Sequence, residues 1–431
     1  MIHIVEKLRK RFPHDGFARH VLTLITGTAI AQIITVGSSP ILTRIYTPDD
    51  FGLYALLFSI SGVFSTVAAG RYELAIMLPE KDDDSINIVA LCVVTASFTS
   101  LILLLFVVSF NATITQLLGT YQISHWLYLV PLQVILTSIY QSLNYWSNRK
   151  KQYKRLAISR ILQSVAILLF SIVLGLTDQG FAGLMISSIC AQVIATALLA
   201  FQILREEKQL VNLIAVANMK KQAVQYINFP KDLTISHFIG IVHQQIPIFL
   251  VSRLFGANSL GFFSIANRFI SLPSTLIANA IGEVFRREAT EHYRRDGRFN
   301  SILKATVRKN FLMALPIYSI LFLFSPFIFS FILGKQWQQA GEYASIMAVM
   351  NFFSFVITPI DKGALIIGAT RYIFFWHLSM LIANVSIGIF FHVQCTTITI
   401  FLWTIAFVRI LHYIFDLYME SKYSYNEIIS H

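Results

Sequence analysis

Charged residues are scarce in this chain. Asp, Glu, Lys and Arg make up 13% of its 431 residues, roughly half the share found in soluble domains. Hydrophobic residues make up 55%, and the mean hydropathy is +0.64. So few polar side chains cannot cover the surface of a water-soluble core of this size. The composition therefore excludes a water-soluble fold and predicts an integral membrane protein.

Cysteine is scarce as well. Cys92, Cys190 and Cys395 each lie inside an apolar run, and their spacing fits neither a disulfide framework nor a metal site. His237 and His243 are six residues apart, which is poor geometry for binding one metal ion. We therefore expect no metal centre, and no cofactor other than H⁺ or Na⁺ as a coupling ion.

Catalytic motifs are missing from the sequence. It contains no Walker-type phosphate loop, zinc motif or nucleophile elbow. A membrane-embedded sugar polymerase or glycosyltransferase would need a sizeable loop with positioned acid and base groups. The outer loops are short, and the largest inner loop, 285–308, is mostly basic. We therefore predict no catalytic residues and no enzyme activity.

Long apolar runs are abundant. A membrane-spanning helix needs about 20 mostly apolar residues, and roughly twelve runs reach that length. They predict an all-α integral membrane protein with about twelve spans, at 18–43, 51–78, 85–109, 122–147, 156–176, 180–204, 230–254, 259–284, 309–333, 341–368, 372–392 and 396–419.

The net charge of +12 is distributed unevenly along the chain. Basic residues mark the cytoplasmic side of a membrane protein. With the N-terminus inside, they gather in the inner segments, whereas the outer loops hold only Arg44, Arg253 and Lys335. This pattern predicts a multi-pass protein with both termini in the cytoplasm. It excludes a nucleic-acid partner, which would require a dedicated domain with a basic face.

The two ends of the chain are predicted to lie on the cytoplasmic surface. Ile2, Val5 and Leu8 recur at helical spacing among basic residues, which indicates an amphipathic N-terminal segment over 1–17. A disordered basic tail is the alternative for this segment. Residues 420–431 form a cytoplasmic tail.

An internal repeat divides the chain. Arg44–Tyr54 (RIYTPDDFGLY) aligns with Arg253–Phe263 (RLFGANSLGFF) at an offset of 209 residues, with matched arginines, glycines and apolar positions. Six spans then fall in each half, at 18–204 and 230–419, joined by a cytoplasmic linker at 205–229. Because six is even, both halves have the same orientation, which predicts two pseudo-symmetric six-helix bundles related by parallel repeats.

The first repeat motif, followed by Arg71-Tyr-Glu-Leu-Ala-Ile-Met-Leu-Pro79, resembles the start of the polysaccharide-transport flippases. These include the O-antigen flippases called Wzx. They belong to the multidrug/oligosaccharidyl-lipid/polysaccharide (MOP) exporter superfamily, which also holds the multidrug and toxin extrusion (MATE) transporters and the lipid II flippase. The resemblance implies a V-shaped pair of bundles in a bacterial inner membrane.

The cargo that the resemblance implies is an oligosaccharide on undecaprenyl diphosphate, such as an O-antigen repeat unit of lipopolysaccharide. It would move from the cytoplasmic to the periplasmic leaflet by alternating access. Partners would be the lipid-linked glycan, the bilayer, a polysaccharide polymerase and a chain-length regulator. Related flippases use cationic cavity residues on the first, second and eighth spans. The alternative within the superfamily is a MATE-type, cation-coupled multidrug exporter.

Polar stripes within the spans indicate a wet cavity lined by spans 1, 2, 7 and 8. Ionisable groups inside spans cost about 2.5–3.5 kcal/mol on insertion scales and face protein or water. The stripes contain Arg268, Ser271, Thr275, Asn279 and Glu283 on the eighth span, His237 and Gln244 on the seventh, Thr28 and Gln32 on the first, and Ser59, Gly62, Thr66, Gly70 and Glu73 on the second. Helix packing is the alternative where a stripe holds only small residues and hydroxyls.

Basic residues in or near spans are candidates for binding a diphosphate, because a guanidinium can bind its oxygens bidentately. They are Arg268, Arg71, Arg160, Lys362 and Arg409. Snorkelling to the membrane surface is the alternative for Arg71 and Arg160, and pairing with Asp361 or Asp416 is the alternative for Lys362 and Arg409. Glu73, Asp361 and Glu283 are the candidates for coupling transport to H⁺ or Na⁺.

Overall fold

The described part of the computed structural model, residues 16–361, 363–394 and 396–425, is almost entirely helical and contains no strand. Ten of its helical stretches are long and apolar enough to cross a membrane. One of them, Phe229–Asp296, contains both the seventh and the eighth predicted span. The prediction of an all-α membrane protein is confirmed. Most of the predicted N-terminal segment 1–17, the end of the tail at 426–431, and Lys362 lie outside the described residues.

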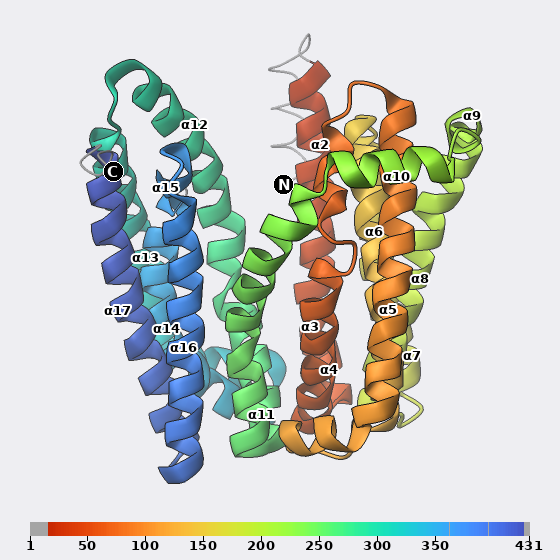
Figure 1. The fold of residues 1–431 in the computed structure, drawn as a ribbon. Helices are drawn as coiled ribbons and strands as arrows, with labels where there is room; N and C mark the ends of the chain where they lie inside the picture. The colour runs from red at the N-terminus through yellow and green to blue at the C-terminus, as the bar shows by residue number, and fades with distance from the viewer. Residues whose placement is uncertain (1–15, 362, 395, 426–431) are drawn as a thin grey trace. The chain divides into compact units, whose positions relative to one another are not determined.

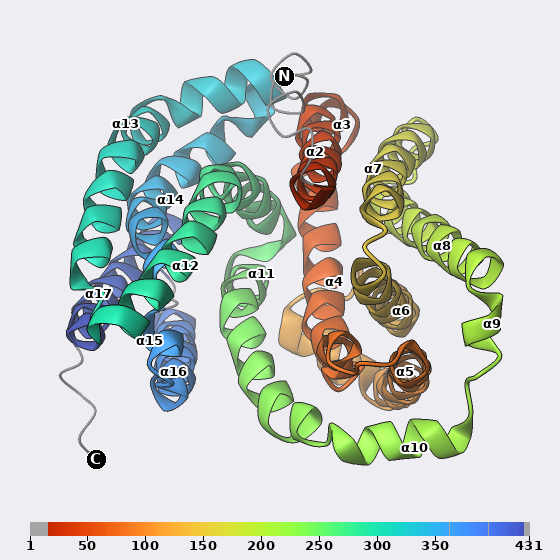
Figure 2. The ribbon, with the colours of Figure 1, turned by 90° about the horizontal axis from the view of Figure 1, so that it is seen from above.

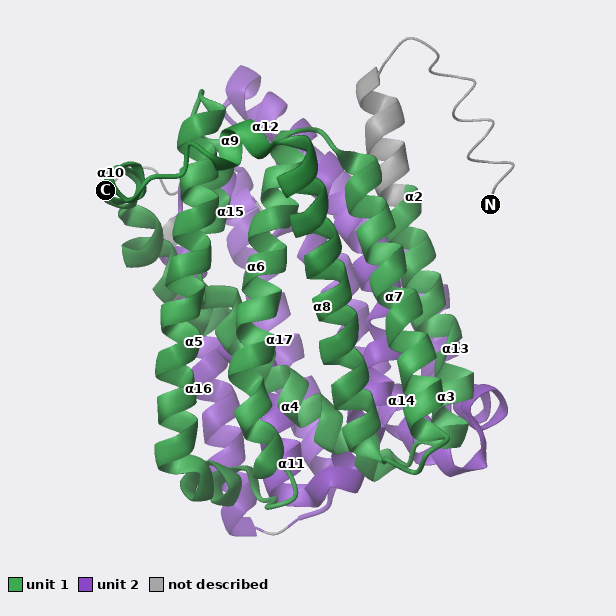
Figure 3. Ribbon diagram, turned by 90° about the vertical axis from the view of Figure 1, so that its right-hand side faces the viewer, with its two compact units in different colours: residues 1–241 green, residues 242–431 purple. Residues whose placement is uncertain are grey.

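The chain divides into two compact units, Met1–Ile241 and Val242–His431 (Figure 3). The helices of unit 1 are α2 (Gly16–Gly37), α3 (Ser39–Ile45), α4 (Pro48–Val67), η1 (Tyr72–Met77), α5 (Asp82–Leu118), η2 (His125–Leu129), α6 (Val130–Arg149), α7 (Tyr153–Gly175), α8 (Phe181–Glu206), α9 (Lys208–Val211), α10 (Val216–Gln225) and η3 (Phe229–Leu233).

Unit 2 contains most of the long helix α11 (Thr234–Ile270), which begins in unit 1. Its other helices are η4 (Ser274–Ala278), α12 (Asn279–Asp296), α13 (Asn300–Leu333), η5 (Lys335–Trp337), α14 (Gln338–Ile357), η6 (Thr358–Ile360), α15 (Gly363–Ile366), α16 (Thr370–Gln394) and α17 (Ile398–Ser424). Within this unit α13 packs most extensively against α14, and α14 in turn packs against α17.

Each copy of the repeat motif forms a junction between two helices. Thr47 caps α4: its hydroxyl accepts from the Asp50 backbone N–H, and the Asp50 carboxylate accepts from the Thr47 N–H at 2.9 Å. In the second copy α11 is broken at Gly256, which has φ 81°. Thr47 and Gly256 are 209 residues apart. The helix break therefore falls at the same position in both copies, as a structural repeat requires.

The second predicted span ends earlier than its hydropathy indicates. Helix α4 stops at Val67, and Gly70 and Arg71 both have positive φ, at 62° and 60°. This left-handed turn ends α-helical geometry, and the chain continues as the short 3₁₀ helix η1. Gly70 and Glu73 were predicted to belong to the α-helical stripe that begins at Ser59, but they lie on the turn and on η1, and Arg71 lies on the same turn.

The eighth predicted span is also interrupted. Pro273 has no N–H to donate, and the next five residues form the π-helical turn η4. Thr275 lies within that turn and Asn279 and Glu283 follow it, so Asn279 and Glu283 are shifted in register from Arg268 and Ser271. The single α-helical stripe expected from these five residues is therefore not formed.

Helix α10 lies crosswise at one end of unit 1, roughly perpendicular to α5 and α6 (Figure 1) and beside the end of α5 (Figure 2). Side chains of α5 hold the segment that precedes it: the Asn87 amide donates to the Leu213 carbonyl at 3.2 Å and accepts from the Ala215 N–H at 2.9 Å. Gln222 of α10 donates to Asp84 at 2.6 Å. The predicted linker 205–229 is thus an ordered part of unit 1.

Candidate functional site

Unit 1 contains a polar cavity of about 680 Å³. Its wall is built from α2, the turn before η1, η1 itself, α6 and α7. The lining residues are Thr28, Ala31, Gln32, Thr35, Arg71, Glu73, Tyr140, Gln141, Asn144, Tyr145, Asn148, Arg160, Gln163 and Ser164. Five of the predicted site residues, Thr28, Gln32, Arg71, Glu73 and Arg160, are therefore brought together in one place.

Arg71 and Glu73 form an ion pair in the wall of this cavity. Arg71 Nη1 lies 3.1 Å from Glu73 Oε1, and the side chain of Glu73 is 3% exposed. The buried Glu73 Oε2 and Arg71 Nε have no hydrogen-bond partner among the described residues. A non-glycine residue in left-handed geometry costs about 1–3 kcal/mol. The turn that costs this energy is the one that places the Arg71 guanidinium at the cavity.

Arg160 of α7 is the second cation in the wall. Its Nη1 donates to the Thr28 hydroxyl of α2 at 2.6 Å, and it forms no ion pair with a described residue. One turn further along α7, Ser164 accepts a longer hydrogen bond, 3.4 Å, from Thr35 of α2. The charged side chains that line the cavity in the described chain are thus Arg71, Arg160 and Glu73, with a net charge of +1.

Helix α6 supplies five polar or aromatic residues to the cavity that sequence reasoning missed: Tyr140, Gln141, Asn144, Tyr145 and Asn148. Gln141, Asn144 and Asn148 are three and four residues apart, so they lie on one helical face. That spacing was visible in the sequence as a polar stripe inside an otherwise apolar run. The opposite face of the helix is buried in the core of the unit.

The buried face of α6 is held in place by a charged cluster. The Trp146 indole N–H donates to Glu207 Oε2 at 2.6 Å. Arg155, itself 5% exposed, pairs with Glu207 Oε1 at 3.2 Å and with Glu206 at 2.6 Å. Leu143 and Trp146 also belong to the hydrophobic core. These contacts fix the rotation of α6 and so fix the direction in which its polar face points.

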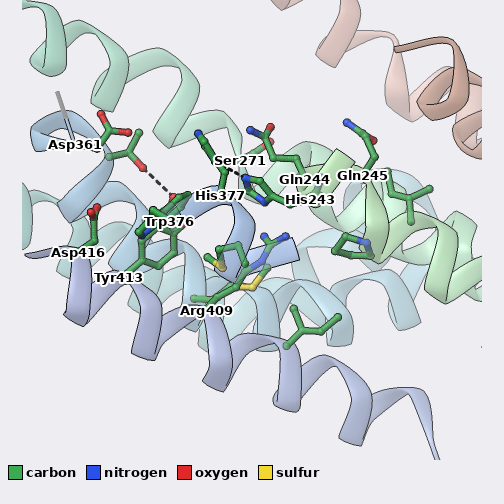
Figure 4. Close-up of a pocket in the computed structure, with 18 of the residues that line it drawn as sticks. His243, Gln244, Gln245, Ser271, Asp361, Trp376, His377, Arg409, Tyr413 and Asp416 are labelled. Carbon is green, nitrogen blue, oxygen red and sulfur yellow. Dashed lines mark hydrogen bonds between the residues drawn. The ribbon is translucent and has the colours of Figure 1, made fainter. Parts of the chain in front are cut away.

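Unit 2 contains a second cavity, of about 420 Å³, shown in Figure 4. It lies among α11, α14, the segment after η6, α16 and α17. Gln244, Ser271, Asp361 and Arg409 of the predicted set line it. Asp361 and Asp416 lie toward one end of the view, and Gln244 and Gln245 lie toward the other (Figure 4).

Two hydrogen-bonded pairs organise this second cavity. His243 of α11 and His377 of α16 contact each other through Nε2 and Nδ1 at 2.9 Å, with stacked rings. The Tyr372 hydroxyl of α16 donates to Asp416 of α17 at 2.6 Å. Sequence reasoning passed over Tyr372, Trp376 and His377 because the eleventh span shows no polar stripe; only its packing against α11 and α17 reveals them.

The remaining predicted site residues lie elsewhere in the described chain. Arg268 is half-buried on α11, and it is not among the residues that line either cavity. His237, Thr275, Asn279 and Glu283 are exposed, and Glu283 pairs with Arg286 on α12. A single cavity shared by spans 1, 2, 7 and 8 stays a prediction. Among described residues no group of three or more His, Cys, Asp or Glu is placed to hold a metal ion.

Residues 41–342 match the family described as "Polysaccharide biosynthesis protein". Among curated proteins, the chain is similar to the succinoglycan biosynthesis transport protein ExoT of Rhizobium meliloti (strain 1021). The two are 24% identical over 370 residues, which cover 83% of this chain and 70% of ExoT.

Two solved structures are similar to this chain across nearly its whole length. The lipid II flippase MurJ, in an inward closed conformation, shares 15% identity with a TM-score of 0.72, covering 94% of this chain and 90% of MurJ. An inward-facing MATE family multidrug transporter of the MOP superfamily shares 13% identity with a TM-score of 0.57, covering 95% and 96%. At such identities the likeness establishes the fold alone.

Proposed function

The chain belongs to the polysaccharide biosynthesis protein family, and we propose that it is a flippase that carries a lipid-linked glycan across a membrane. The family resemblance inferred from the Arg44–Tyr54 and Arg71–Pro79 motifs is confirmed. The chain is a transporter of the MOP fold rather than an enzyme. We also propose which cargo the protein carries, in which direction it moves that cargo, and which ions are coupled to transport.

The polar cavity of unit 1 is the observation that carries the proposal. Two guanidinium groups, from Arg71 and Arg160, line one cavity that also holds amides and hydroxyls. A diphosphate offers oxygen acceptors to guanidinium groups, which bind phosphate oxygens strongly and directionally. Sugar hydroxyls can pair with the amides. A glycan joined to a lipid through a diphosphate has the chemistry that this wall complements.

We propose undecaprenyl-diphosphate-linked oligosaccharide as the cargo, such as an O-antigen repeat unit. It would move from the cytoplasmic to the periplasmic leaflet of a bacterial inner membrane by alternating access, in which the halves 18–204 and 230–419 move against each other. Both termini would lie in the cytoplasm. Moving negative charge out of a negative-inside cell gains about 2.3 kcal/mol per charge per 100 mV. The membrane potential can therefore drive export of the diphosphate.

The test has two parts. Mass spectrometry of the purified protein identifies the lipid bound to it, and we expect a polyprenyl diphosphate bearing a glycan. In proteoliposomes, flipping of that lipid is expected to accelerate when a potential of the matching sign is imposed. Flipping that is unchanged when the potential and ion gradients are removed contradicts the proposed driving force, and co-purification of phospholipid alone contradicts the cargo.

Coupling to H⁺ or Na⁺ and assembly with a polysaccharide polymerase and a chain-length regulator are further parts of the proposal. Glu73 and Asp361 support the first, because each lines a cavity of its unit. Capture of the polymerase by cross-linking in membranes tests the second.

A multidrug exporter is the second candidate. It is favoured by the unit 2 cavity, where Asp361 and Asp416 lie beside the aromatic residues Tyr372 and Trp376. Carboxylates and aromatic faces together suit organic cations. Resistance to cationic drugs on overexpression, with no glycan lipid bound, would favour this function over the flippase.

A further inference from the structure

The polar face of α6 is the feature of the unit 1 cavity that diphosphate binding leaves unexplained. Gln141, Asn144 and Asn148 line the cavity over two helical turns, and all three are half-buried. Their side-chain amides form no hydrogen bond with any described residue. None of their amide atoms is among the buried unpaired atoms of the described chain, so the amides are open to the cavity. Three such groups on one face are therefore available to pair with a molecule that enters the cavity.

Several other amides in the helices of unit 1 do have partners. Asn87 is bonded to the segment before α10, and Asn111 donates to the Ser124 carbonyl at 2.9 Å. Even at the cavity, Gln163 of α7 donates to Gln192 at 2.7 Å. The three amides of α6 differ from these in lining the cavity without such a partner. They are also pre-positioned, because Trp146 and Leu143 fix the opposite face of the helix in the core.

The hydrogen-bonding groups of these amides are better suited to one part of a lipid-linked glycan, the sugar, than to the other, the diphosphate. An amide presents an acceptor oxygen and two N–H donors. A phosphate oxygen only accepts, so it would use the donors and leave the amide oxygen unpaired. A sugar hydroxyl both donates and accepts and can use both ends. Tyr140 and Tyr145 add two aromatic rings to the same wall, and such rings offer apolar surface to the C–H face of a sugar.

We propose that Gln141, Asn144 and Asn148 of α6, with Tyr140 and Tyr145, form a glycan-recognition subsite that selects the sugar of the transported lipid. This inference rests on the proposed function and extends it. Arg71 and Arg160 bind the diphosphate, which every such lipid has, and the α6 subsite binds hydroxyls, whose arrangement differs from one glycan to another. The subsite therefore determines specificity.

The experiment compares binding of bare and sugar-bearing lipids to the full-length protein in nanodiscs. The probes are undecaprenyl diphosphate and a set of undecaprenyl-diphosphate-linked mono- and disaccharides that differ in hydroxyl configuration. The variants are Gln141→Leu, Asn144→Leu and Asn148→Leu, singly and together. Gln133→Leu is the matched control, because Gln133 is a buried amide on the same helix that does not line the cavity.

We expect the wild-type protein to bind at least one sugar-bearing probe at least about tenfold more tightly than undecaprenyl diphosphate. Each leucine substitution should reduce that preference about fivefold, the typical effect of one hydrogen bond. In the triple variant the sugar-bearing probes should fall to the affinity of the bare lipid. The Gln133→Leu protein should keep the wild-type preference.

Thermal unfolding distinguishes a role of the three amides in sugar recognition from a role in stabilising the folded protein. Because the three amides have no partner in the described protein, their replacement should leave the melting temperature unchanged or raise it. A fall in melting temperature together with equal weakening of all probes would overturn the proposal. So would a wild-type protein that binds every sugar-bearing probe no more tightly than undecaprenyl diphosphate.

Failure of the proposed function would look different. In that case the wild-type protein would not bind undecaprenyl diphosphate at all, and Arg160→Ala would change nothing. Normal binding of the bare lipid, with a sugar preference that the triple variant retains, contradicts the α6 subsite alone.

Discussion

At the scale of single residues, Arg160 is the cation whose substitution gives the clearest prediction. It is held at the cavity by one neutral hydrogen bond, to Thr28, so its guanidinium can exchange partners at little cost. Hydrogen bonds to charged groups contribute about 1.5–3 kcal/mol. We therefore expect Arg160→Ala to weaken binding of undecaprenyl diphosphate about 10–100-fold, and Arg160→Lys to weaken it less, since the charge remains without the planar fork.

Titration of undecaprenyl diphosphate into the purified variants checks this prediction. Arg44→Ala is the control, because Arg44 is exposed on α3 and donates to the Pro40 carbonyl away from the cavity. Equal binding by Arg160→Ala and the wild-type protein would contradict the role given to Arg160.

Glu73 offers a test of ion coupling. The Glu73→Gln variant keeps the size of the side chain but removes the negative partner of Arg71. We expect its transport rate in proteoliposomes to lose its response to an imposed H⁺ or Na⁺ gradient, because glutamine cannot exchange a proton or balance a cation. Asp361→Asn applies the same test to the unit 2 cavity.

Two outcomes are informative for these variants. A variant that transports at the full rate and still responds to the gradient removes its residue from the coupling mechanism. A Glu73→Gln protein that also binds undecaprenyl diphosphate more tightly would show that Glu73 and the lipid compete for Arg71.

Some of the site could be predicted residue by residue, and some could not. Gln32, Arg71 and Arg160 could be predicted because ionisable and amide side chains inside apolar runs are costly and so stand out, and Thr28 could be predicted because it lies one turn from Gln32 on the same helical face. The pairing of His243 with His377 could not be predicted, since it depends on the packing of α11 against α16, which hydropathy does not encode.

At the scale of elements, α10 is held by side chains of α5, and Asn87 is central to this attachment. It is fully buried and bonds to the carbonyl of Leu213 and the N–H of Ala215. Asn87→Leu would leave both backbone groups unpaired, at about 1–3 kcal/mol each. We expect the free energy of unfolding to fall by roughly 2–4 kcal/mol and the segment 212–225 to open locally.

Hydrogen–deuterium exchange measures that opening directly. Residues 212–225 should exchange faster in Asn87→Leu, whereas Gln116→Leu, an exposed position on the same helix, should leave them protected. If both variants exchange like the wild-type protein, α10 does not depend on α5 for its position.

The sequence was a good guide to where helices lie and a poorer guide to where they end. Apolar runs of bilayer length mark the helices because lipid requires every backbone group to be paired internally. The ends near Val67 and Pro273 were missed, since hydropathy continues through both. The first end depends on positive φ at Arg71, which a non-glycine residue rarely adopts, and the second depends on a π turn.

At the scale of the whole molecule, the predicted topology can be tested by labelling. In a variant without native cysteines, Arg298→Cys should react with a membrane-impermeant reagent only from the cytoplasmic side, and Lys335→Cys only from the outside. Both positions are exposed in the structure. The basic loop 285–308 should stay in the cytoplasm because positively charged loops resist translocation. Reaction of both cysteines from one side would refute the assignment of α13 as a span.

The backbone at Arg71 has a consequence for engineering this protein. Glycine adopts left-handed φ without the penalty that arginine incurs there, so in a Glu73→Gln background, where no buried carboxylate loses its ion-pair partner, a screen for thermostability would favour glycine at position 71. The same exchange would delete one of the two guanidinium groups of the unit 1 cavity. Selection for thermostability would therefore enrich glycine at position 71, whereas selection for cargo binding would enrich arginine. A library sorted for each property in turn would show which of the two the arginine serves.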